Sequence, residues 1–440
     1  MNSLPSPALP PGGNPAPDPR SRSRRLPSTS RLTLAVLLTL PAALSQPFEL
    51  QLNRPSMDRW MYPFNASPGS RPSAPVFATF GDAAGVDTRH GQFLLGFDLE
   101  GHVPSGLGPE SYLIRRARLS VTVSRDQSFL YDPTHDPVAT YLDETDPDHL
   151  PDPDPGRPVE LFGAGFRNGY TAGTFLDDSP FGGTGPGERH AYAVGHDRHG
   201  AWVDIGNHVG KSDPAFPVFE VHPFALGRTD VVSPGDPVPA GTTLHFDFHL
   251  GDPFVLRYLQ EACDTGRLRL VITSLHSGAL GGAPAWPDFF TAESVLGEVP
   301  RLELDGTAVR PDLDTDTDGL PDDWEEFHFG DLRYDADADP DGDGASNGQE
   351  WRAGTDPTDP RNRLAITLAS PSPDVPSWTV RLNHAAGRRY LIETSADLQA
   401  WTTVADPIWS YDHARGLAAW NDPADSAEIP SARFFRVRLP

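Results

Sequence analysis

Two acidic stretches of the chain share the same spacing of oxygen-bearing side chains. Both place them at positions 1, 3, 5, 9 and 12 of a twelve-residue segment, with glycine (Gly319 or Gly344) at position 6. A calcium ion takes six to eight oxygens at about 2.3–2.6 Å, so the chain must coil tightly to turn alternate residues inward. The spacing predicts two calcium loops with ligands Asp314, Asp316, Asp318, Leu320, Asp322 and Glu325 in the first, and Asp339, Asp341, Asp343, Ala345, Asn347 and Glu350 in the second.

Each predicted loop runs into a short helix. Leu320 and Ala345 would supply only backbone carbonyls, whereas the glutamates at position 12 lie on the helix and can donate both carboxylate oxygens. Ser346 and Gln349 form a capping-box pattern, and Gly354 is a typical helix end. The alternative is an acidic, solvated linker that matches by chance. It is disfavoured because the two copies agree at six positions.

The residues before each loop lack the pattern of an entering helix, so the unit is a loop followed by a helix. This region resembles the bacterial thrombospondin type 3 repeat, and the resemblance is carried by residues 318–325, 339–344, 349–350 and 353–360. The resemblance implies that the aspartates bind calcium and that the module lies between other domains of a secreted protein. Residues 305–359 contain 18 acidic residues and three arginines, a net charge of 3 − 18 = −15. Without cations such a segment repels itself.

The N-terminus has the pattern of a secretory signal over residues 1–45. Arginines precede the apolar run 32–40, and small residues follow at 43–45. The alternative is a buried first strand. The apolar run is too short to span a bilayer, and no second long apolar segment follows. We therefore expect a secreted or cell-surface protein without a transmembrane span after signal removal.

Composition narrows the class of protein further. The formal net charge of −26 argues against nucleic acid and anionic membrane as partners. Cys263 is the only cysteine, so the chain cannot form an internal disulfide, and we expect it to be a packed apolar residue rather than a nucleophile. The 48 prolines and 41 glycines, interspersed with short apolar runs, favour strands and loops.

The predicted fold is all-β, in three parts. A large jelly-roll-like sandwich spans 46–305, the calcium module spans 306–360, and a small sandwich spans 361–440. Period-two strand patterns support both sandwiches and occur at 92–98, 117–123, 243–250, 267–273, 378–382, 389–394, 401–404 and 434–439. The stretch 143–155 is too rich in proline for a strand, and we expect its carboxylates to be solvated.

Two fainter resemblances concern the predicted sandwiches. The first resembles the jelly-roll sandwich named for its DNRLRE motif, through residues 93–98, 103–106, 114–123, 289–294 and 300–304, whereas 125–240 lies outside that pattern. This resemblance implies carbohydrate binding. The second sandwich, through residues 390–401, is similar to C-terminal β modules of secreted planctomycete and verrucomicrobial proteins.

Catalytic patterns are weak. Residues 206–212 nearly form a phosphate loop but have one residue too few between the glycines. His245, Asp247 and His249 alternate along one strand and are either a metal trio or its polar outer face. We therefore expect a non-enzymatic calcium-binding protein whose partner is an extracellular glycan or surface protein, with a polysaccharide-active enzyme as the alternative. The oligomeric state is not predicted.

Overall fold

The computed structural model describes residues 46–80, 88–183, 187–196, 201–209, 220–278, 285–369, 379–383, 390–404, 409–412, 417–421 and 434–438. The predicted signal segment lies outside the described residues. So do Trp378, Arg389 and Leu439 at the ends of predicted strands, and residues 210–212 of the near phosphate loop. The all-β prediction is confirmed, because the described chain forms antiparallel sheets with three α-helices.

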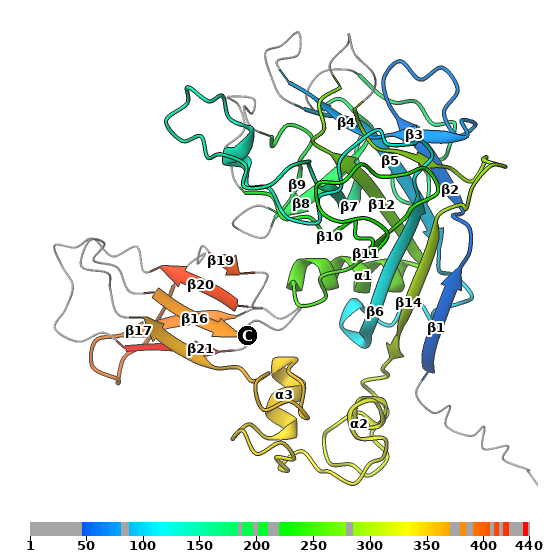
Figure 1. Ribbon diagram of the computed structural model, residues 1–440. Helices are drawn as coiled ribbons and strands as arrows, with labels where there is room; N and C mark the ends of the chain where they lie inside the picture. The colour runs from blue at the N-terminus through cyan, green and yellow to red at the C-terminus, as the bar shows by residue number, and fades with distance from the viewer. Residues whose placement is uncertain are drawn as a thin grey trace, which may run out of the picture. The chain divides into compact units, whose positions relative to one another are not determined.

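Two sheets build the larger body (Figure 1). The smaller sheet has the order β1 (Gln46–Leu52), β14 (Arg301–Ala308), β6 (Tyr112–Thr122) and β11 (Thr243–Asp247). The larger has the order β2 (Met57–Met61), β5 (Thr88–Asp98), β12 (Arg267–Ser274), β7 (Val159–Phe166), β8 (Ala191–His196) and β9 (Trp202–Asp204). In addition, β4 (Phe77–Thr79) pairs with β5, β10 (Ala225–Leu226) pairs with β7, and β3 (Ser73–Pro75) pairs with β13 (Asp288–Phe290).

The strand alternation predicted from sequence produces the core between these sheets. Leu302 and Leu304 of β14 are buried in one apolar cluster with Leu270 and Ile272 of β12, which lies in the other sheet. Less buried residues alternate with them along β14. In contrast, β12 is buried on both faces, because Val271 belongs to a second apolar cluster with Leu94 and Phe162. Successive strands such as β5, β6, β7, β11, β12 and β14 alternate between the sheets, which is the connectivity of jelly-roll sandwiches.

The segment 125–240 is part of this sandwich although it lies outside the DNRLRE-type pattern. It contributes β7, β8, β9 and β10 to the larger sheet, and β7 pairs directly with β12. The same segment carries a short 3-10 turn, η2 (Val138–Tyr141), and a second one, η1 (Pro109–Ser111), precedes β6.

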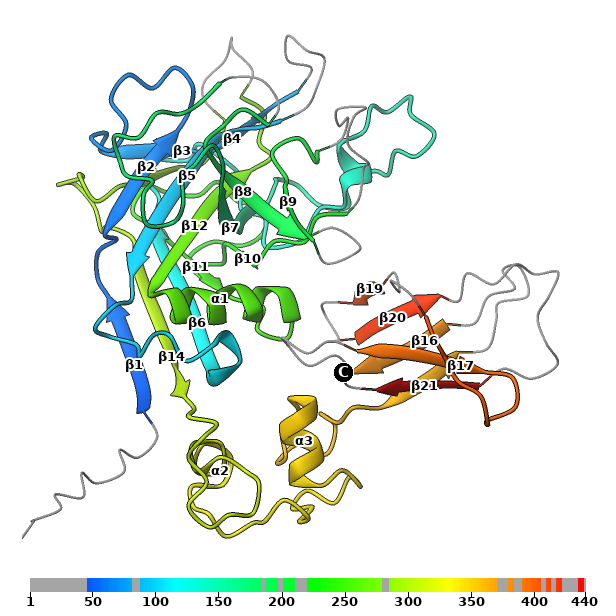
Figure 2. The same ribbon diagram turned by 180° about the vertical axis from the view of Figure 1, so that it is seen from behind.

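One helix was not predicted. α1 (Pro253–Thr265) begins after Asp252, whose carboxylate accepts hydrogen bonds from the first-turn amides, and it ends at Gly266 in the left-handed conformation. It packs beside β6 and β12 (Figures 1 and 2). Cys263 lies on its inner face and is fully buried in the apolar core, as expected of a packed apolar residue.

The C-terminal part forms two further sheets. One has the order β15 (Ile366–Ala369), β16 (Thr379–Asn383), β20 (Leu417–Asn421) and β19 (Trp409–Asp412). The other has the order β18 (Thr402–Thr403), β17 (Leu391–Ser395) and β21 (Phe434–Arg438). Val380, Ile392 and Trp420 share a buried cluster, so the two sheets pack face to face.

Along the chain, α2 (Asp322–Phe329) and α3 (Asn347–Ala353) follow β14 and precede β15, each directly after an acidic loop. None of the helices in the described part of the chain combines the length and apolar character that a bilayer-spanning segment needs.

Candidate metal centre

The two acidic loops fold alike, residue for residue. The carboxylate at position 1, Asp314 or Asp339, accepts backbone N–H groups four and five residues on, at 3.2 and 3.0 Å in both loops. Glycine at position 6 has φ +94° (Gly319) and +95° (Gly344), a left-handed conformation that other residues rarely adopt. The sequence repeat is therefore a repeat of backbone structure.

The exit of each loop is fixed in the same way. The Asp322 N–H donates to the Leu313 carbonyl at 2.9 Å, and the equivalent Asn347 N–H donates to the Ala338 carbonyl at 2.8 Å. These bonds close the loop just as the helix begins. The acidic residue at position 12 then lies in the first helical turn, where the helix dipole favours negative charge.

The helix signals in the sequence operate as expected. The N–H of Ser346 donates to Gln349 Oε1 at 3.0 Å within a capping box, and Gly354 ends α3 in the left-handed conformation. Pro321 occupies the N-cap position of α2, one residue before the first turn, without a side-chain capping hydrogen bond, and α2 ends at Gly330 in the left-handed conformation. The residues preceding each loop are not helical, so each unit is a loop plus an exiting helix.

The structure brings most of the predicted ligands together. In the first loop, Asp314, Asp316 and Asp322 gather ligand atoms within 4.8 Å of one another, and so do Asp316, Asp318 and Glu325. In the second, Asp339, Asp341 and Asp343 do the same. Glu350 is fully buried but belongs to none of these close carboxylate groups, and Asn347, at position 9 of the same loop, is also fully buried. For Leu320 and Ala345, the predicted contribution is a backbone carbonyl and stays a prediction.

Position 9 differs between the two loops. Both oxygens of Asp322 accept hydrogen bonds from Thr315, from its N–H at 2.7 Å and from its hydroxyl. Asn347 instead donates its side-chain amide to the Asp335 carbonyl at 3.0 Å, which leaves its Oδ1 without a hydrogen-bond partner among the described residues. The second loop therefore offers a freer oxygen at this position.

Several buried ligand oxygens have no hydrogen-bond partner in the described part of the chain. A buried carboxylate oxygen without a donor is costly, and native structures rarely contain one without a bound ion or water. Seven side-chain oxygens of the two loops and their exiting helices are in this condition: Asp318 Oδ2, both Oε atoms of Glu325, Asp341 Oδ2, Asp343 Oδ2, Asn347 Oδ1 and Glu350 Oε2. All are hard oxygen donors, so the residues present fit a calcium-sized cation.

The raised pKa values of the two position-12 glutamates agree with a cation site. Burial, followed by the charge of Asp318 and other neighbouring aspartates, raises the pKa of Glu325 to about 8. Burial is also the main cause that raises the pKa of Glu350 to about 7, against a hydrogen bond from Thr355. Negative charge at these positions is therefore unfavourable without a cation and favourable with one.

A small apolar cluster joins the two units. Trp324 of α2 is 2% exposed and shares a buried cluster with Val309 and Leu320. Its ring centroid lies 5.9 Å from that of Trp351 on α3, in an edge-to-face arrangement. The loops are therefore linked through packed side chains as well as through the chain.

Sequence reasoning missed one structural carboxylate. Asp323 is fully buried and pairs with Arg310, whose backbone N–H, Nε and Nη2 donate to it at 2.8, 3.0 and 3.1 Å. This pair ties α2 to the segment after β14. The only sequence signal is that Arg310 is one of three arginines in an acidic segment, so a carboxylate partner for it is expected.

The second unit is similar to a known repeat. Residues 339–360 match the family model of the bacterial TSP3 repeat. The TSP3 repeat is a calcium-binding repeat typical of extracellular proteins. The match covers the second loop, α3 and the Asp- and Pro-rich residues after it. A comparison with curated proteins finds no match.

Two members of the histidine–aspartate trio, His245 and Asp247, lie on the polar outer face of the sheet. His245 Nδ1 lies 2.8 Å from the Ser120 hydroxyl, and Asp247 accepts two hydrogen bonds from Arg118, at 2.6 and 2.8 Å. β11 ends at Asp247, so His249 lies beyond the strand. Among the described residues, none of this trio belongs to a group of side chains close enough to hold a metal ion.

Proposed function

We propose that residues 306–360 bind two calcium ions and thereby stiffen the connection between two β domains, 46–305 and 361–440, of a secreted or cell-surface protein. The observation that carries this proposal is the set of buried, partnerless oxygens in both loops. The equivalence of the two loops supports it, because one family-matched TSP3 loop and its structural copy share backbone hydrogen bonds and glycine conformation.

The proposed role is structural. Extracellular calcium modules have dissociation constants of about 10⁻⁴–10⁻³ M, so the sites would be filled wherever calcium is in the millimolar range. The −15 charge of residues 305–359 opposes compaction in the absence of cations. Two calcium ions offset part of this repulsion and hold the acidic loops in one conformation. A module that is permanently filled acts as a stiffener rather than as a sensor.

The test is calcium stoichiometry. Asp318→Ala and Asp343→Ala each remove a carboxylate with a partnerless buried oxygen, and each is expected to lower the number of bound calcium ions by one in isothermal titration calorimetry. The matched control is Asp337→Ala, an exposed aspartate of the same module that lies outside the close carboxylate groups, and it should leave the stoichiometry unchanged. Unaltered stoichiometry in both loop variants would contradict the ligand assignment.

We further propose that the larger sandwich contacts a glycan, as an adhesive or carbohydrate-binding domain. The supporting observation is a cleft of about 880 Å³ whose lining includes Phe80, Tyr141, His149, Asp152 and Arg157. The Phe80 and Tyr141 rings are nearly parallel, with centroids 6.4 Å apart. Aromatic rings beside polar side chains are suited to sugars, which present both apolar faces and hydroxyl groups.

A glycan array tests this second proposal. We expect binding to at least one oligosaccharide class, and Phe80→Ala should weaken it at least tenfold. The control, Phe64→Ala, removes a more exposed phenylalanine (75% against 37%) that does not line the cleft. Release of reducing sugar from a bound glycan would instead favour the polysaccharide-active enzyme, and absence of binding across the array would contradict the proposal.

A further inference from the structure

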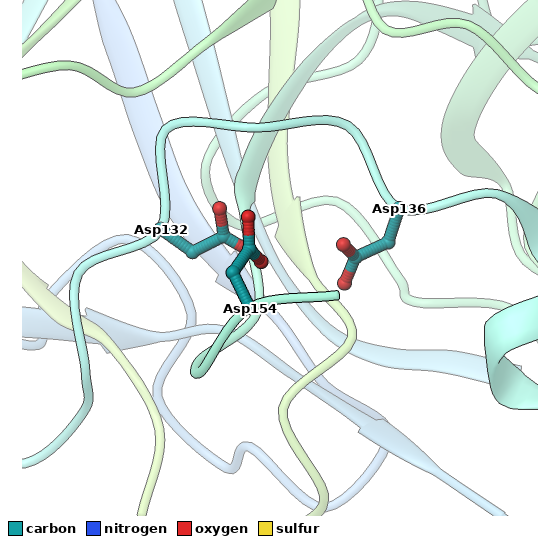
Figure 3. Close-up of side chains that lie close together, drawn as sticks. All are labelled: Asp132, Asp136 and Asp154. Atoms are coloured by element: carbon teal, nitrogen blue, oxygen red, sulfur yellow. The ribbon is translucent and has the colours of Figure 1, made fainter. Parts of the chain in front are cut away.

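A third group of carboxylates lies in the larger sandwich, away from the TSP3-like loops. Asp132, Asp136 and Asp154 each place one oxygen within 4.8 Å of the others. Figure 3 shows the carboxylates of Asp132 and Asp154 turned toward each other, with that of Asp136 facing them. The three residues come from two loop segments, one after β6 and the other before β7.

Long-range contacts hold these segments in place. The backbone of Tyr131 pairs with residues of the 233–238 turn, accepting from Gly235 at 2.8 Å and donating to Asp236 at 2.9 Å. Gly156, at φ +109°, approaches so closely that a Cβ there would lie 3.1 Å from Asp132 Cβ and from the Leu130 carbonyl oxygen. The position of Asp132 relative to the 151–156 segment is therefore built into the fold.

Asp136 is held by its own set of donors. Arg157 Nη1 donates to its Oδ2 at 2.8 Å and the Tyr141 hydroxyl at 2.9 Å. The same arginine also pairs with Asp152 at 2.7 Å. With one arginine against four aspartates, the local charge is 1 − 4 = −3. The arginine orients one carboxylate without neutralising the group.

Asp132 and Asp154 have fewer donors than their burial requires. The Thr134 hydroxyl lies 2.6 Å from Asp132 Oδ1 and 3.1 Å from Asp154 Oδ2, but its single proton can serve only one of them. Asp132 is 3% exposed, and its Oδ2 has no hydrogen-bond partner among the described residues. Asp154 Oδ1 is also buried and has no hydrogen-bond partner among the described residues. Two carboxylates thus face each other with partnerless oxygens shielded from water.

Such an arrangement requires a shared proton or a cation. Two oxygens bound to one calcium-sized ion at about 2.3–2.6 Å can be no more than about 5 Å apart, a limit that this cluster meets. The donors are all oxygens, which select a hard cation over a thiophilic one.

We propose that Asp132, Asp136 and Asp154 bind a third divalent cation, of the calcium class, inside the larger sandwich. This site is independent of the 306–360 module. Its effect is local to the cleft described above, because Thr140, Tyr141 and Leu142 of the cleft lining lie between Asp136 and Asp154 in the chain, and Asp152, Gly156 and Arg157 flank Asp154. A bound ion would fix this wall of the cleft.

The test uses the full chain carrying Asp318→Ala and Asp343→Ala, so that the module contributes no calcium. Equilibrium dialysis against Ca²⁺, with metal content measured by mass spectrometry, is expected to leave one bound equivalent. Asp132→Asn, which preserves size and the Thr134 contact, should remove it. Asp148→Asn, a control at an exposed aspartate outside the cluster in the same loop region, should retain it.

Hydrogen–deuterium exchange is a second readout, which keeps the proposal testable when one variant folds poorly. In the same background, adding Ca²⁺ should slow hydrogen–deuterium exchange of peptides covering residues 131–157, and Asp154→Asn should abolish that protection. Circular dichroism verifies that each variant is folded. A chain that binds no calcium in this background, or whose 131–157 peptides exchange equally with and without Ca²⁺, holds a shared proton only, and the proposal is then wrong.

Discussion

Removing calcium at pH 8 is expected to lower the melting temperature of the 306–360 module by about 10–20 °C. About tenfold calcium excess over the dissociation constant stabilises a folded unit by about 1.4 kcal/mol per site, or about 2.8 kcal/mol for two sites. For a unit of this size, each kcal/mol shifts the melting temperature by about 4–8 °C. Hydrogen–deuterium exchange of peptides covering residues 306–360, followed against temperature, measures the transition with and without EGTA.

The decrease in melting temperature on calcium removal should depend on pH. In the ion-free fold, Glu325 and Glu350 have pKa values of about 8 and about 7, against an ordinary value of 4.5. A carboxyl whose folded pKa is raised contributes stability that is fully present below the unfolded pKa and is lost as pH rises through the folded pKa. The ion-free module is therefore more stable at pH 6 than at pH 8.

Calcium removal should consequently lower the melting temperature less at pH 6 than at pH 8. Re-addition of Ca²⁺ after chelation is the control and should restore the original transition at both pH values. Melting curves that superimpose with and without EGTA at pH 8 would contradict the two-ion assignment. A larger loss at pH 6 would contradict the assignment of the raised pKa values to the ligand glutamates.

Trp324→Ala is expected to destabilise the module by about 3–5 kcal/mol, the range for removing a large buried aromatic side chain. This exceeds the roughly 2.8 kcal/mol that two bound ions supply at about tenfold excess. Because Trp324 packs on Leu320 in the first loop and contacts Trp351 on the second helix, both sites should lose affinity together. Calorimetry with Ca²⁺ and urea unfolding measure the two effects.

The matched control for this variant is Trp401→Ala. Trp401 is half-buried in the C-terminal body, where the Arg436 guanidinium lies 4.2 Å from its ring centroid. It is expected to leave calcium affinity unchanged. If Trp324→Ala binds two ions with the affinity of the unaltered chain, the apolar cluster does not couple the loops.

The calcium loops could be predicted from sequence because all their determinants lie within twelve residues. Ligand spacing, the obligatory glycine and the helix caps are local properties, and local properties survive in the amino-acid pattern. The same holds for the strands, whose period of two can be recognised without knowing their partners. The pairing of β7 with β12, across more than a hundred residues, had no such signal.

The other differences between prediction and structure concern one helix and one group of carboxylates. α1 has its start and stop signals in Asp252, Pro253 and Gly266, whereas the Pro- and Gly-rich composition of the chain favours strands and loops, and no helix is predicted there. We expected the carboxylates of 143–155 to be solvated, and for Asp154 this was wrong because its Oδ1 is buried. Its neighbour Asp132 is 22 residues away in sequence, and only the folded loops bring the two together.

The burial of Cys263 in α1 has a practical consequence. Since it is the only thiol of the chain and is fully enclosed, the native surface offers nothing to maleimide or methanethiosulfonate reagents. Cysteines introduced in pairs, one in each β body, would therefore carry spin labels or dyes without background. The width of the resulting interlabel distance distribution would then give a direct measure of how much rigidity the ions impart.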